Sequence, residues 1–174
     1  MEKLFENKTP YTYEEYLKLN KFHFSKSKKV YNILIIACII LIYSISIFML
    51  IVGSKILEPI LYIIFATALG GIIKVIPYVA TKSITKTDSF INNVTNDEVF
   101  YDEYLINKTE QSELKVLYNQ VFKAYETKTH FYIYVNKRAA MIVNKENFIL
   151  GNVDEFRKFL NNKLDNKFIS KYKL

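Results

Sequence analysis

Two long apolar runs constrain this chain more than any other feature of its sequence. The first, residues 30–52, has 23 residues and no charged side chain. The second, residues 56–78, also has 23 residues and carries only Glu58 near its start and Lys74 near its end. A hydrocarbon core about 30 Å thick is crossed by about 20 helical residues. The runs therefore predict two transmembrane helices that form one hairpin within residues 30–80.

The remaining composition excludes several classes of protein. Of the 174 residues, 51% are hydrophobic and 24% are charged, which excludes a disordered chain. Cys38 is the only cysteine, and His23 and His130 lie far apart without cysteine partners, so we expect neither a disulfide framework nor a zinc site. No phosphate-binding glycine loop or nucleophile motif occurs. The sequence therefore predicts no catalytic residue, no metal ligand and no cofactor, and an enzyme is the least favoured class of function.

The lysines predict how the hairpin is oriented. Two of them, Lys82 and Lys86, follow the second run, whereas the connection between the runs holds only Lys55. Five lysines stand before the first run with no acid among them: Lys18, Lys21, Lys26, Lys28 and Lys29. The positive-inside rule then predicts a multi-pass protein of the cell membrane with both termini in the cytoplasm. The chain has a net charge of +7, and the lysines that produce it are clustered beside the spans. We therefore expect these lysines to contact anionic lipid headgroups and not nucleic acid.

Two features of the second run bear on packing and depth. Ala66 and Gly70 are four residues apart, a spacing of small residues that lets another helix approach closely. We expect the first span to be that helix, through Ala37, Cys38 or Ser44, with a homodimer as the alternative. Lys74 lies one turn before Pro77 and Tyr78. A lysine at such a depth is expected to extend its aliphatic stem toward the headgroups.

The N-terminal segment, residues 1–29, contains a helix start signal. Thr12 and Glu15 have the spacing of a capping box, which predicts a helix from about Tyr13. Phe22 and Phe24 stand next to the lysines, as in helices that lie at a membrane surface. We therefore expect an interfacial helix, and packing of this helix on the C-terminal domain is the alternative.

Residues 87–174 have a different pattern, which predicts a β-rich domain closed by a helix. After Gly151, Asn152 is a candidate N-cap. The residues that follow form an apolar stripe of helical period: Val153, Phe156, Phe159, Leu160 and Leu164. Short runs rich in aromatic and β-branched residues predict strands at 99–101, 103–106, 120–125, 131–135 and 139–143. The fold class expected for the whole chain is thus an α+β membrane protein.

Two stretches carry a resemblance to a known family. The stretch VFKAYETKTHFYIYVNKRAAMIVNKENF from Val121, followed by DEFRKFL from Asp154, resembles the YcxB-like family of bacterial membrane proteins. The opening YTYEEYLKLNKFHF from Tyr11, ahead of two spans, resembles the same family. The resemblance implies that the C-terminal domain is a small β-rich module similar to pleckstrin-homology-like domains. It implies no activity.

These observations lead to a function hypothesis with two alternatives. We expect a non-enzymatic membrane protein that presents its β-rich domain at the cytoplasmic face to a protein partner. An immunity protein, which protects a producer cell against a membrane-active toxin, is the first alternative, and a membrane enzyme is the second. Pleckstrin-like modules can bind phosphorylated headgroups through basic loops. The candidate residues for such a basic rim are Lys128, Lys137, Arg138 and Lys145.

Overall fold

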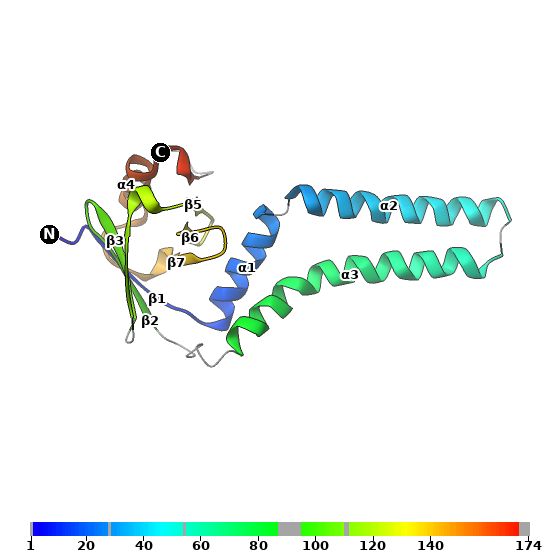
Figure 1. Ribbon diagram of the computed structural model, residues 1–174, viewed down its shortest axis with the longest axis horizontal. Helices are drawn as coiled ribbons and strands as arrows, with labels where there is room; N and C mark the ends of the chain where they lie inside the picture. Colours follow the sequence, from blue (N-terminus) through cyan, green and yellow to red (C-terminus); the bar gives the residue numbers. More distant parts are fainter. Residues whose placement is uncertain (1, 28, 54, 87–94, 110–111, 171–174) are drawn as a thin grey trace. The chain divides into compact units, whose positions relative to one another are not determined.

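The computed structural model describes residues 2–27, 29–53, 55–86, 95–109 and 112–170 (Figure 1). The chain divides into two compact units. The first, called here the β unit, comprises Met1–Glu15 and Ile91–Leu174, and the second, the helical unit, comprises Tyr16–Phe90. The helices are α1 Tyr13–Ser27, α2 Lys29–Ile51, α3 Leu57–Thr85 and α4 Val153–Leu164. The strands are β1 Phe5–Pro10, β2 Thr95–Phe100, β3 Tyr104–Lys108, β4 Glu113–Leu117, β5 Lys123–Glu126, β6 His130–Tyr134, β7 Ala140–Asn144, β8 Phe148–Leu150 and β9 Phe168–Ile169.

In the helical unit, α2 and α3 pack against each other as a hairpin. Ala66 is completely buried, and a Cβ added to Gly70 would lie 3.9 Å from Ile39 Cδ1. The hydroxyl groups of Tyr43 and Thr67 lie 2.7 Å apart across the same contact. Gly70 therefore lies at the contact with the first run. The residue that it meets there is Ile39, whereas the expected Ala37, Cys38 and Ser44 are exposed.

Both helices are long and apolar enough to span a membrane, and they leave most of their apolar surface exposed. The most apolar window of α2 is 6% buried and that of α3 is 11% buried. The core helix of a soluble protein is mostly buried, because its apolar stripe is the part that folding removes from water. The α3 helix continues to Thr85, past the expected end at Tyr78, and it contains Pro77.

The α1 helix packs on the last turns of α3 within the helical unit. Asn20 Nδ2 donates a hydrogen bond of 2.9 Å to Thr81 Oγ1. Lys21 Nζ lies 4.7 Å from the ring centroid of Tyr78. The helix begins at Tyr13, where Thr12 Oγ1 accepts a hydrogen bond from the Glu15 backbone N–H, as the capping signal predicts. The sequence predicted that this helix lies at the membrane interface or packs on the C-terminal domain, and neither expectation included the contact with α3.

The described residues of the β unit form two sheets. The five-stranded sheet has the order β4-β3-β2-β1-β8, and all of its neighbours are antiparallel. The four-stranded sheet has the order β7-β6-β5-β9, in which only β5 and β9 are parallel. The predicted strands correspond to β2, β3, β5, β6 and β7, with shifted ends, whereas β1, β4, β8 and β9 were not expected. Residues 120–122 precede β5 and are not part of a strand.

Strand β1 comes from the N-terminal segment and lies between β2 and β8. Pro10, its last residue, is paired with Thr95, the first residue of β2. The five-stranded sheet therefore includes residues outside 87–174. Because β1 and β2 are antiparallel neighbours, the whole helical unit is inserted in the chain where a simple hairpin would have only a turn.

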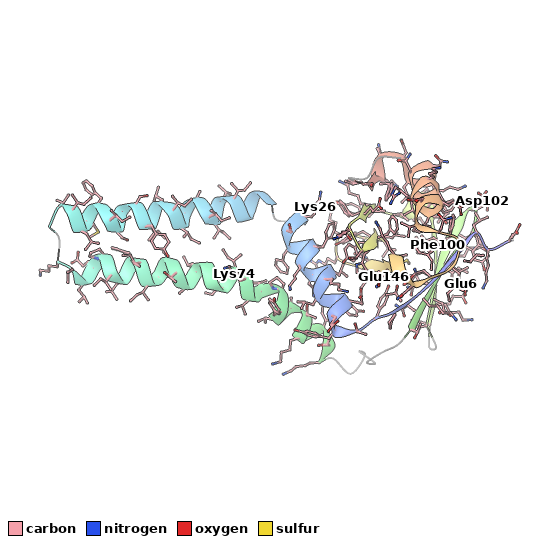
Figure 2. All side chains as sticks on the ribbon, turned by 180° about the vertical axis from the view of Figure 1, so that it is seen from behind. Glu6, Lys26, Lys74, Phe100, Asp102 and Glu146 are labelled. Atoms are coloured by element: carbon pink, nitrogen blue, oxygen red, sulfur yellow. The ribbon has the colours of Figure 1, made fainter. Side chains whose placement is uncertain are left out.

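The core of the β unit is aromatic and centres on Phe156 of α4, which is completely buried. The centroid of its ring lies 4.6 Å from the ring centroid of Phe100. Figure 2 labels Phe100 inside the β unit. The rings of Phe5, Phe131 and Phe148 lie 5.1–5.2 Å from that of Phe156. Asn152 Oδ1 caps α4 by accepting from the backbone N–H groups of Asp154 and Glu155, as predicted. Phe156, Leu160 and Leu164 are buried, which confirms the inward side of the predicted stripe.

Candidate functional sites in the two units

The lysines predicted to contact headgroups lie on two helices of the helical unit. Lys18, Lys21 and Lys26 are exposed on α1. Lys28 and the side chain of Lys29 lie outside the described residues. On α3, Lys74 and Lys82 are exposed, as is Lys86 at its C-cap. The only acid among the described residues of this unit is Glu58, in the first turn of α3. The helical unit therefore has a strongly basic end and an almost uncharged body.

The contacts between α2 and α3 give the position of Lys74 along the hairpin. Tyr43 faces Thr67 and Ile39 faces Gly70, so residues whose numbers add to about 110 lie opposite each other. Lys74 is then opposite residue 36 of α2, whereas Lys29 is opposite residue 81. At 1.5 Å per residue, Lys74 lies about 10 Å further from the basic end than the start of α2. Figure 2 labels Lys74 close to the bend of α3.

One residue of the predicted basic rim belongs to a buried ion cluster of the β unit. The Glu126 side chain is completely buried at the end of β5. Lys145 Nζ donates to Glu126 Oε1 at 2.6 Å, and Arg157 Nη2 donates to the same oxygen at 2.8 Å. Arg157 Nε and Ser170 Oγ donate to Oε2 at 2.9 and 2.6 Å. Lys145 therefore holds an internal carboxylate instead of contributing to an exposed rim.

The surroundings of Glu126 favour its ionised form. Burial alone would raise the pKa of this carboxyl. The hydrogen bonds from Arg157, Lys145 and Ser170 outweigh burial and lower the pKa below its usual value. The three partners of this carboxylate come from different parts of the chain: Lys145 follows β7, Arg157 is on α4 and Ser170 follows β9. The carboxylate therefore connects these three segments to β5.

The other three residues of the predicted rim are exposed but lie at two ends of one strand. Lys128 is in the turn between β5 and β6, and Lys137 and Arg138 are in the turn between β6 and β7. An antiparallel strand has its two connections at opposite ends, so the structure does not bring Lys128 next to the other two. The second turn is fixed by Asn136 Oδ1, which accepts from the backbone N–H groups of Arg138 and Ala139 at 2.8 Å.

Polar side chains of β1 and the residue that follows it hydrogen-bond to the edge strand of the other sheet. Asn7 Nδ2 donates to the Asn144 carbonyl at 2.7 Å, and Thr9 Oγ1 accepts from the Asn144 N–H at 3.0 Å. Tyr11 Oη accepts from the Ile142 N–H at 2.9 Å. These side chains take the place of a further strand along β7, so that edge of the four-stranded sheet is covered. The polar sequence of β1 thus has a structural role that its pattern alone does not reveal.

The same region buries the carboxyl group of Glu98 on β2. Its side chain is inaccessible, and Tyr11 donates a hydrogen bond of 3.0 Å to Oε1. Its Oε2 has no hydrogen-bond partner among the described residues. Burial raises the pKa of Glu98 well above its usual range, although the hydrogen bond from Tyr11 opposes this shift. The surroundings of Glu98 therefore favour the neutral form of its carboxyl group.

A Glu98→Gln variant should be more stable than the wild type at pH 8. The usual pKa of glutamate is about 4.3, so in the pH range above this value the folded state holds a proton that the unfolded state has lost. Stability then falls as pH rises toward the raised pKa, and the amide, which keeps an acceptor for Tyr11, removes this loss. We expect a gain of about 1 kcal/mol or more at pH 8 and little change near pH 4.

Thermal unfolding of the full chain in micelles at both pH values measures this difference. Glu103→Gln is the matched control, because Glu103 is exposed in the turn between β2 and β3. A gain at pH 8 no larger than that of the control would contradict a neutral Glu98.

A second buried pair joins the start of α1 to β6. His130 is 1% exposed, and its Nε2 lies 2.5 Å from Glu15 Oε2. Thr129 Oγ1 lies 2.7 Å from His130 Nδ1. The sequence signal at Glu15 predicts a helix start, and the contact with His130 is an additional role.

A comparison with protein-family models gives a match over part of the chain. Residues 100–160 match the model described as YcxB-like protein. No curated protein and no solved structure matches the chain. The matched segment begins at the end of β2 and ends within α4, so it covers β3 to β8 and the part of α4 up to Leu160. The resemblance to the YcxB-like family is therefore confirmed over residues 100–160.

Proposed function

We propose that this chain is a non-enzymatic integral membrane protein. In this proposal α2 and α3 cross the cell membrane, both termini are cytoplasmic, and the β unit is presented at the inner face. The observation that carries the proposal is the exposed apolar surface of two membrane-length helices that are only 6% and 11% buried. Such a surface is stable in hydrocarbon and unfavourable in water.

The distribution of lysines supports the orientation and the lipid partner. The connection between α2 and α3 has Lys55 alone, whereas the described lysines of α1 and of the last turns of α3 gather at the opposite end. Lys21 lies over the ring of Tyr78, a pairing that suits the level of the headgroups. We propose that Lys18, Lys21 and Lys26 contact anionic headgroups of the cytoplasmic leaflet.

For the β unit we propose a pleckstrin-homology-like module that binds a protein partner. Two mainly antiparallel sheets and a C-terminal helix that fills their core support the comparison of folds. The outer edge of β4 supports a protein partner, since it ends the five-stranded sheet and exposes Leu114 and Leu117. An extended peptide can add to such an edge through backbone hydrogen bonds.

Cysteine labelling in intact cells tests the orientation. In a Cys38→Ser background, a membrane-impermeant maleimide should label a Lys55→Cys variant from outside, because Lys55 lies between the two spans. A Lys137→Cys variant, in an exposed turn of the β unit, should be labelled only after lysis. Labelling of the Lys137→Cys variant in intact cells would contradict the proposed orientation.

A further inference from the structure

The α3 helix bends in its second half (Figure 1). An apolar hollow is lined by residues of the same part of this helix. Pro77 lies within this part of the helix and has no N–H for the helical hydrogen bond, which is a common cause of a bend. The hollow has a volume of about 550 Å³ and is lined by Gly71, Ile72, Val75, Ile76, Val79 and Ala80. This volume is within the range of about 300–1,000 Å³ that is typical of small-molecule sites.

The hollow faces away from α2. A Cβ added to Gly70 would meet Ile39 of α2, whereas a Cβ added to the next residue, Gly71, would meet nothing within 4 Å. Successive residues of a helix point about 100° apart. Gly71 therefore belongs to the surface that the hairpin leaves uncovered, and in a bilayer this surface would contact lipid.

Lys82 and Lys86 lie on the same stripe as the hollow, nearer to the basic end of the helical unit. Gly71, Val75 and Val79 are four residues apart and form one stripe of α3. Lys82 and Lys86 follow at spacings of three and four, so they continue the same stripe. Both lysines are exposed, and the only acid among the described residues of the helical unit is at the other end of α3. An apolar hollow thus leads directly to two positive charges.

We infer that this stripe binds one anionic phospholipid of the cytoplasmic leaflet. One acyl chain lies in the hollow between Gly71 and Ala80, and the headgroup phosphate lies between the ammonium groups of Lys82 and Lys86. The inference rests on the proposed membrane location and adds to it a lipid site on α3, apart from the lysines of α1. A lipid fits better than a second copy, because parallel copies joined at this face would bring their lysines together at the same depth.

Native mass spectrometry of the full chain in detergent, titrated with phosphatidylglycerol or phosphatidylcholine, tests the charged part. We expect Lys82→Gln with Lys86→Gln to weaken phosphatidylglycerol binding by about tenfold or more, because each lysine near an anionic lipid contributes to binding. Phosphatidylcholine binding should not change. Lys55→Gln, which removes one positive charge at the other end of the hairpin, is the control. Equal phosphatidylglycerol binding by the double variant and the wild type would overturn the inference.

A second pair of variants tests the hollow itself. Gly71→Leu fills it and should weaken binding of both lipids, whereas Ala68→Leu adds a similar bulk on exposed α3 surface outside the hollow and should not. If Gly71→Leu leaves lipid binding intact but abolishes a cross-linked dimer, the occupant is a second copy and the inference is wrong. Alkaline extraction of cell membranes separates the two proposals: release of the wild-type chain refutes the membrane location, and retention without lipid preference refutes only this site.

Discussion

Joining β1 directly to the rest of the β unit should convert this chain into a soluble, cooperatively folding protein. The variant links residues 2–15 to residues 91–170 through about eight Gly and Ser residues and omits the helical unit. Pro10 and Thr95 are paired neighbours, so a short connection can replace the natural one. The variant keeps β1, Tyr11 and Glu15, and with them the ladder to β2 and β8 and the hydrogen bonds to β7.

The same variant without residues 2–15 should not fold. It lacks the strand between β2 and β8, the Phe5 ring beside Phe156 and the side chains that cover the edge of β7. These losses are expected to exceed the 5–15 kcal/mol by which a domain of this kind is stable. Circular dichroism during thermal unfolding distinguishes the two chains. A cooperative transition of residues 91–170 alone, at the temperature of the joined chain, would contradict the central position of β1.

Arg157→Met in the joined chain should lower the free energy of unfolding by about 3–5 kcal/mol. The change removes the guanidinium that holds both oxygens of Glu126 and leaves a completely buried carboxylate with fewer partners. Lys158→Met removes the same charge from an exposed position of α4 and should change stability by about 0.5 kcal/mol or less. Urea unfolding at pH 7 measures both variants.

The pH dependence of this loss has a defined sign. The partners of Glu126 lower its pKa in the folded state, so their contribution is present above the usual value of about 4.3. It is lost as pH falls through the lowered pKa, because the carboxyl group is then protonated in both states. The Arg157→Met variant should therefore approach the wild type in acid. A difference from the wild type that stays constant down to the acid limit would show that Arg157 acts through packing instead.

Local sequence patterns were sufficient to predict the elements in which apolar and polar residues lie on separate faces. The stripe of α4 and its Asn152 cap are local signals, and the run around Phe131 is rich in strand-forming side chains. The spacing of Ala66 and Gly70 indicated a contact with α2, although it did not identify Ile39 as the residue that meets Gly70. In each case the residues that carry the signal are within a few positions of one another.

Strand β1 and the ion cluster could not be found in this way, because their partners are distant in sequence. Asn7 and Thr9 are inward-facing polar residues of β1, and both hydrogen-bond to Asn144, which lies more than 130 residues away. A polar segment with such partners is indistinguishable from a loop by its pattern. The sequence assigned Lys145 to an exposed basic rim for the same reason, because its partner Glu126 lies 19 residues away on β5.

The central claim is that residues 16–90 hold an otherwise soluble β unit in the bilayer. Fractionation of cells that express either the full chain or the joined chain tests it most directly. After an alkaline wash, which releases peripheral proteins, the full chain should remain in the membrane pellet and the joined chain should be in the supernatant. Release of the full chain with the soluble fraction would contradict the claim, because helices that expose this much apolar surface would then have to be covered by protein and not by lipid.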